Sequence, residues 1–118
     1  MVQIDLFRNE TEFKSFAAGD TIFREGDTEK LMYVVLEGEI QLSVKGHAVE
    51  TLGSGGVLGE LSLIDAAPRS ATAVALSACK LVPITEHRFM FMVQQTPKFA
   101  LQIMRVVADR LRAMDKRL

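Results

Sequence analysis

Short runs of β-branched and aromatic residues, separated by turn-forming residues, fill the first two thirds of this 118-residue chain. Runs this short and this closely punctuated by Gly, Asp and Ser favour β-strands over helices. The runs that we interpret as strands are residues 21–23, 31–36, 40–44, 48–52, 70–76 and 80–84. We expect the last two of them to pair with each other. Many short strands with regular turns indicate a sandwich or barrel, and two Greek keys would make it a jelly roll.

The clearest hairpin in the sequence lies between residues 40 and 52. Residues 40–44 alternate between apolar and polar side chains, as the two faces of a half-buried strand require. Lys45, Gly46 and His47 follow as a predicted tight turn, because glycine accepts the positive φ that such turns need. Residues 48–52 then form the return strand.

The last third of the chain changes to a helical period. Thr85 is a suitable N-cap for a helix over residues 86–95, and Pro97 is suited to the first position of another. Apolar residues then recur near helical spacing and predict one packing stripe, made of Phe99, Ile103, Val107, Leu111, Met114 and Leu118. We therefore expect one domain over residues 1–118, with a β body at about 13–84 and C-terminal helices at about 85–118.

Composition excludes several classes of protein. The formal net charge is −1, so bulk charge attracts neither nucleic acid nor a membrane surface. No apolar run approaches the roughly 20 residues that a membrane-spanning helix needs. The first residues lack the basic and apolar regions of a signal peptide, and one cysteine, Cys79, forms no internal disulfide. These features predict a cytoplasmic protein, and the basic residues after Arg105 are interpreted as a solvated helix face.

The segment between residues 58 and 73 carries the chemistry. Gly59 and Glu60 follow a glycine-rich loop and open about one helical turn, where unpaired backbone N–H groups suit an anion. Pro68 ends this turn, and Arg69 stands at the start of an apolar run. A guanidinium in such a place needs a partner, and its fork matches the oxygens of a phosphate.

The same residues allow a purely structural interpretation. Glu60 could cap the short helix, where a carboxylate is favoured. Arg69 could pair with Glu60 or Asp65 and bind no ligand at all. The residues alone leave the two interpretations open, and they do not name the anion.

The stretch Gly59-Glu60-Leu61-Ser62, followed by Pro68-Arg69-Ser70-Ala71-Thr72, resembles the phosphate-binding cassette of cyclic nucleotide-binding domains. That family includes bacterial catabolite activators, regulatory subunits of cyclic-nucleotide-dependent kinases, and nucleotide-gated channels. The resemblance extends upstream through residues 16–27 and 33–40, and it covers roughly residues 13–118. One departure is Leu58, where the family often has an aromatic residue. The resemblance implies a mainly β fold, a double-stranded β-helix (jelly-roll) barrel with a short cassette helix and C-terminal α-helices.

The resemblance also implies a role for individual residues. Glu60 would accept a hydrogen bond from the ribose 2′-hydroxyl, and Arg69 would pair with the cyclic phosphate. The backbone N–H groups that would surround the ribose and the phosphate belong to Gly59, Leu61, Ser62, Ser70 and Ala71. The last helix would fold over the base as a lid, with Arg110 stacking on the purine. A plainer interpretation makes Arg110 an exposed charge on the polar side of that helix.

The function implied is a regulatory sensor that binds a cyclic nucleotide, cAMP in the first place, with cGMP compatible with the Ser70 hydroxyl. Nothing follows the last helix, which ends at Leu118, so we expect a small stand-alone bacterial form whose effector is a separate, unidentified protein. The alternative is an interaction protein with the same fold and an unused pocket, whose C-terminal helix pairs with a partner or a second copy. We expect no enzyme activity, cofactor or metal site, and no direct contact with nucleic acid.

Overall fold

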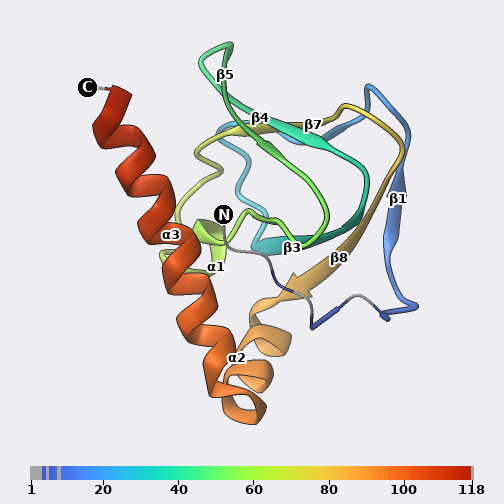
Figure 1. Ribbon diagram of the computed structural model, residues 1–118, viewed down its shortest axis with the longest axis vertical. Helices are drawn as coiled ribbons and strands as arrows, with labels where there is room; N and C mark the ends of the chain where they lie inside the picture. Colours follow the sequence, from blue (N-terminus) through green and yellow to red (C-terminus); the bar gives the residue numbers. More distant parts are fainter. Residues whose placement is uncertain (1–3, 5, 8, 118) are drawn as a thin grey trace.

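The computed structural model describes residues 4, 6–7 and 9–117, and it places eight strands in two four-stranded antiparallel sheets. Figure 1 shows the longest helix running along one side of the sheets, with a second helix beside its first turns. The strands are β1 (Lys14–Phe16), β2 (Thr21–Phe23), β3 (Leu31–Glu37), β4 (Ile40–Val44), β5 (His47–Leu52), β6 (Val57–Leu58), β7 (Thr72–Ala75) and β8 (Cys79–Thr85). The helices are α1 (Leu61–Ile64), α2 (Glu86–Gln95) and α3 (Pro97–Arg117).

The expected jelly-roll architecture is confirmed, as two facing sheets with strand orders β1-β8-β3-β6 and β2-β7-β4-β5. Among the described residues no ladder joins the sheets, so the barrel is not closed. The expected pairing of the strands near 70–76 and 80–84 is wrong, because β7 pairs with β2 and β4 while β8 pairs with β1 and β3. The crossing between the sheets is fixed at Glu39, whose carbonyl accepts from Leu76 N and whose N–H donates to the Ser77 hydroxyl.

The β4–β5 hairpin forms as predicted, with Ile40 opposite Leu52. Its turn contains two residues, Lys45 with φ 51° and Gly46 with φ 81°. His47 was expected in the turn and lies instead in β5, opposite Val44. A two-residue turn with two positive φ angles matches the right-handed twist of the strands, so it leaves His47 free to extend the ladder.

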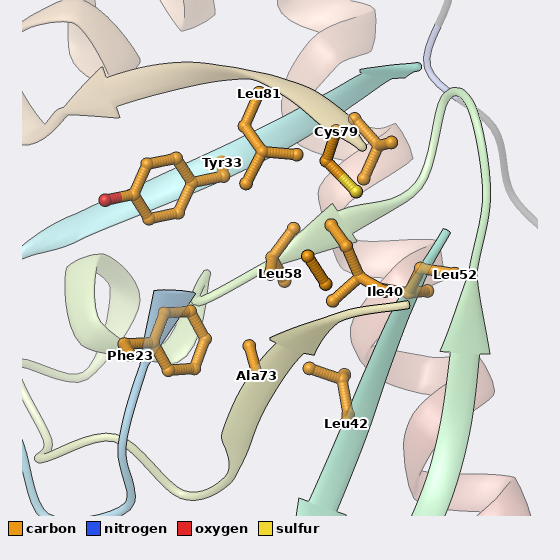
Figure 2. Close-up of a cluster of buried hydrophobic side chains, with 11 residues drawn as sticks. Phe23, Tyr33, Ile40, Leu42, Leu52, Leu58, Ala73, Cys79 and Leu81 are labelled. Atoms are coloured by element: carbon orange, nitrogen blue, oxygen red, sulfur yellow. The ribbon is translucent and has the colours of Figure 1, made fainter. Parts of the chain in front are cut away.

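The β3 strand is buried on both faces and separates two hydrophobic clusters. Tyr33 and Val35 point between the sheets, where Figure 2 shows Leu81 and Phe23 near Tyr33 and Ile40 and Leu52 farther along the same cluster. The alternate residues of β3 pack on the other side, against the C-terminal helices. The continuous apolar sequence at 31–36 follows from this double burial.

The C-terminal helices begin where the sequence predicts. The Thr85 side chain accepts from Arg88 N at 3.2 Å and caps α2, and α3 starts at Pro97. No helix of the described residues is long and apolar enough to span a membrane.

The stripe expected along α3 is correct only at its start. Phe99 and Ile103 are buried, but the next buried residue is Val106, and Leu111 is 60% exposed. On a helix of 3.6 residues per turn, each step of four residues rotates the side chain by about 40° around the helix axis. The later residues of the expected stripe therefore point away from the packed face. Leu118 and the side chain of Met114 lie outside the part of the chain that the structure describes.

Candidate functional site

A cavity of about 590 Å³ lies between the inner face of the β2-β7-β4-β5 sheet, the segment after β6, and α3. Its volume falls in the range typical of small-molecule sites. Apolar side chains of the sheet form much of its wall, including Phe23, Leu42 and Leu52. All the site residues predicted from the sequence line this one cavity: Gly59, Glu60, Leu61, Ser62, Arg69, Ser70, Ala71 and Arg110.

Gly59 creates the sharp bend between β6 and α1. Its φ is +79°, and a Cβ at this position would collide with the guanidinium of Arg69 and lie 3.0 Å from the Leu31 carbonyl oxygen. Both the backbone angle and the space therefore require glycine.

Glu60 occupies the N-cap position of α1, but its side chain makes no capping bond, so a capping role does not account for its buried carboxylate. A helix of four residues sums few peptide dipoles, and the attraction for an anion must come mainly from side chains. The polar groups of Ser62 already bond within the protein, because its N–H donates to the Gly59 carbonyl and its hydroxyl accepts from Arg69.

Arg69 is the buried cation of the site, with its side chain 1% exposed. Its Nη1 donates to the Gly59 carbonyl at 3.2 Å and to Ser62 Oγ at 3.0 Å. The guanidinium carbon lies 4.2 Å from the centre of the Phe23 ring. Its Nε has no hydrogen-bond partner within the described residues, and a buried donor left unpaired costs about 1–3 kcal/mol. An acceptor entering the cavity would relieve that cost.

The alternative interpretation that paired Arg69 with Glu60 or Asp65 named the wrong partner, because Arg69 Nη2 lies 3.2 Å from Glu29 Oε1. The Glu29 side chain is 54% exposed, so water screens its charge and weakens the pair. Tyr33 responds to both charges. Burial raises the pKa of Tyr33, the charge of Glu29 raises that pKa further, and Arg69 lowers it.

Arg110 reaches the cavity from α3, and the interpretation of it as an exposed charge is wrong. Its side chain is 22% exposed and bonds to the carboxylate of Glu60, which is 4% exposed. Its Nε donates to Glu50 Oε1 at 3.0 Å, and its Nη2 donates to the Val57 carbonyl. Burial lowers the pKa of Arg110, but the two carboxylates outweigh that effect and the net pKa is raised. Arg110 is therefore charged at every physiological pH.

Sequence reasoning missed Glu29, Glu50, Phe23 and Asp109 as members of the site. Glu50 had a usable signal, because it shares the inward face of β5 with Leu52 and pairs with the buried Leu42. Glu29 follows no strand or helix period, so its contact with Arg69 had no local signature. Among the described residues, no three His, Cys, Asp or Glu side chains gather as a potential metal site.

Known proteins resemble this chain in sequence. The family model for the cyclic nucleotide-binding domain matches residues 13–96. The cyclic AMP receptor protein of Thermus thermophilus is 28% identical over 118 residues, which cover 96% of this chain and 55% of that protein. The chain thus spans about half the length of this curated relative.

Solved structures agree with the sequence matches. The crystal structure of the Thermus thermophilus catabolite activator protein matches with a TM-score of 0.82 at 29% identity, over 96% of this chain and 55% of that chain. The cGMP-bound form of the EAL enzyme Bd1971 matches with a TM-score of 0.69 at 28% identity, over 89% of this chain and 29% of that chain. Its cAMP-bound form gives a TM-score of 0.66 at 29% identity, over 88% and 29%.

Proposed function

Because the chain belongs to the cyclic nucleotide-binding domain family, we propose that it is a regulatory module that binds a purine cyclic nucleotide, cAMP in the first place. The observation that carries this proposal is the buried guanidinium of Arg69, which lines an open cavity and whose Nε has no partner in the part of the chain that the structure describes. Such a group is suited to a phosphate, which supplies several acceptor oxygens and a negative charge.

In the proposed complex the cyclic phosphate lies against Arg69 and the ribose lies at Glu60. A carboxylate has about four lone-pair sites, so Glu60 can accept from a ribose hydroxyl while it keeps its bond to Arg110. The backbone N–H groups of Gly59, Leu61, Ser70 and Ala71 complete the phosphate site. Ser62 contributes indirectly, because its hydroxyl holds Arg69 in place.

Charge supports this orientation of the ligand. Arg69 has one carboxylate partner, and that partner is half exposed to water. Arg110 faces two carboxylates, Glu50 and Glu60. An anionic phosphate is therefore favoured at Arg69 and disfavoured at Arg110, which directs the base toward α3, where the face of Arg110 stacks on the purine.

We propose cAMP ahead of cGMP because of the ligands named for the similar proteins. The Thermus thermophilus relative is a cyclic AMP receptor protein, whereas the EAL enzyme Bd1971 has both cGMP-bound and cAMP-bound forms. The exposed Ser70 hydroxyl at the cavity rim is compatible with either base. We place cAMP first and treat cGMP as the competing ligand. The module is proposed to act in the cytoplasm as a sensor and not as an enzyme, through an effector protein and without direct contact to nucleic acid.

Titration calorimetry of the purified chain with cAMP and cGMP tests the binding. Arg69→Ala should weaken cAMP at least about 100-fold, because it removes a buried charge-assisted contact worth roughly 3 kcal/mol. Arg24→Ala, which changes an exposed arginine, is the matched control and should bind like the wild type. A wild type that binds neither nucleotide, or an Arg69→Ala variant that binds normally, would refute the proposal.

The alternative, an interaction function of α3, is favoured by a second apolar face. Leu101, Met104 and Leu111 are exposed and, with Ala108 between them, follow the three-and-four spacing of a coiled-coil seam. Exposed Arg105 and Arg112 flank this seam, and antiparallel pairing would set them against each other, so we propose a parallel pair with a second copy. Light scattering should find a dimer that Leu111→Glu dissociates, and a monomeric wild type would contradict this role.

A further inference from the structure

Glu50 lines the cavity but lies outside the cassette-like stretch of residues 59–72. It stands on β5 opposite Leu42, its side chain is 26% exposed, and Oε1 accepts from Arg110 Nε at 3.0 Å. Sixty residues separate Glu50 from Arg110 along the chain. A carboxylate that points inward among apolar residues of a sheet requires a hydrogen-bonding or charged partner, because its desolvation is otherwise unfavourable.

The Arg110 guanidinium is held at each of its three nitrogens. Nε bonds to Glu50, Nη1 bonds to Glu60, and Nη2 bonds to the Val57 carbonyl. These acceptors come from β5, from the start of α1 and from β6, so three separate elements fix the plane of one guanidinium. Each nitrogen already has an acceptor, and the two flat faces are the surfaces best suited to a ligand, because they stack well on aromatic rings.

The two carboxylates that bond to Arg110 differ in whether the bound nucleotide would also bond to them. Glu60 is the proposed acceptor for the ribose, and its oxygens are then shared between Arg110 and the ligand. In the proposed complex Glu50 accepts from Arg110 and makes no bond to the ligand. Asp109 also lines the cavity, but it is the immediate neighbour of Arg110 on α3, bonds to Arg112 at 3.5 Å, and points from a different side of the helix.

We infer that Glu50 is a positioning residue, which fixes the plane of the Arg110 guanidinium so that one face of it supports the nucleotide base. This inference rests on the proposed function and adds a residue that the family's cassette does not contain. Glu50 acts through Arg110 and makes no contact with the ligand itself. Its removal leaves Arg110 paired with Glu60, so no buried charge is left without a partner and the fold is retained.

Calorimetry on Glu50 variants of the full chain tests the inference. Glu50→Ala should weaken cAMP about tenfold, which corresponds to about 1.4 kcal/mol. Glu50→Gln should lie between the wild type and Glu50→Ala, because its amide oxygen can still accept from Arg110 Nε without the charge. Thr51→Ala, an exposed change on the same strand outside the cavity, is the matched control. Wild-type affinity in Glu50→Ala would overturn the inference.

Two further measurements separate positioning from other roles. In an Arg110→Ala background, adding Glu50→Ala should cause no further loss, whereas an additive loss would mean that Glu50 contacts the ligand directly. An abasic ribose 3′,5′-cyclic phosphate, tested by competition, should bind equally to wild type and Glu50→Ala, whereas a general loosening of the pocket would weaken it as well. Failure of the wild type to bind any cyclic nucleotide would reject the proposed function itself, which is a different result from an unaffected Glu50 variant.

Discussion

The two ends of the cavity each contain an arginine, but the two arginines are used in opposite ways. Arg69 is almost fully buried, has one half-exposed carboxylate as its ion-pair partner, and keeps an unpartnered Nε within the described residues. Arg110 is partly exposed and is held by two carboxylates and a carbonyl. Burial alone therefore does not identify a binding cation. Each arginine makes three side-chain hydrogen bonds, but they are distributed differently. The buried Nε of Arg69, without a partner among the described residues, marks it as the ligand-binding arginine, and the bond at each of the three nitrogens of Arg110 marks it as a fixed support.

Gly59→Ala should have the strongest effect, at the Arg69 end of the cavity. The backbone at this position has a positive φ, which alanine disfavours, and the added Cβ collides with the guanidinium, so the free energy of unfolding should fall by about 3 kcal/mol and cAMP binding should be lost. Gly46→Ala is a matched control, because Gly46 also has a positive φ but no described residue beyond its chain neighbours lies within 4 Å of its Cβ position. Urea denaturation should show the smaller loss, about 1 kcal/mol, for Gly46→Ala. Equal losses in the two variants would mean that the collision with Arg69 is unimportant.

Arg110→Ala would disrupt the other end of the cavity, and it should lower stability as well as remove the proposed support for the base. It leaves the buried carboxylate of Glu60 without its cation, which should lower the free energy of unfolding by about 2 kcal/mol. Adding Glu60→Gln should recover part of this loss, because the uncharged amide no longer needs a cation. Arg112→Ala on the exposed side of α3 serves as the control and should change stability by less than about 0.5 kcal/mol. The comparison fails if Arg112→Ala is as costly as Arg110→Ala.

Glu29→Gln should increase the affinity of the Arg69 end of the cavity for an anion. Glu29 competes with a bound phosphate for Arg69, so its neutralisation should tighten cAMP binding by about two- to fivefold. Glu37→Gln removes a carboxylate from a different exposed pair, with Lys80, and should leave affinity unchanged. Weaker binding in Glu29→Gln, measured by calorimetry, would show instead that Glu29 orients Arg69 for the ligand.

The smallest effect is a spectroscopic one at Tyr33. The chain has one tyrosine and no tryptophan, so tyrosinate absorbance reports on Tyr33 alone. Burial and Glu29 raise its pKa above the ordinary value near 10, and Glu29→Gln should lower that pKa toward 10. Because the folded-state pKa is the higher one, the associated stability is present below pH 10 and is lost as pH rises through the folded pKa. An unchanged Tyr33 pKa in Glu29→Gln would show that the charge of Glu29 does not influence Tyr33.

Much of the fold was predictable because it is encoded by near neighbours. The β4–β5 hairpin follows from alternation and from Gly46, and the start of α2 follows from the hydroxyl of Thr85. The pairing of β7 with β8 was mispredicted because the chain crosses between sheets at residues 76–78, and strand propensity contains no information on which sheet a strand joins. The α3 stripe failed for a similar reason, since the packed face depends on which residues the sheets present to the helix.

The sequence was sufficient to predict six of the eight described strands, the starts of the C-terminal helices and the cassette from Gly59 to Ala71, because those features depend on contacts between residues close together in the chain. The strands β1 and β6 were not among the expected runs. Which charges meet depends on the tertiary fold. Glu29 lies 40 residues from Arg69, Glu60 lies 50 residues from Arg110, and Glu50 lies 60 residues from it. Ion pairs form through space, and their strength depends on distance and burial, neither of which a linear pattern contains. The sequence therefore pointed to the two arginines, and the fold assigned them their different surroundings.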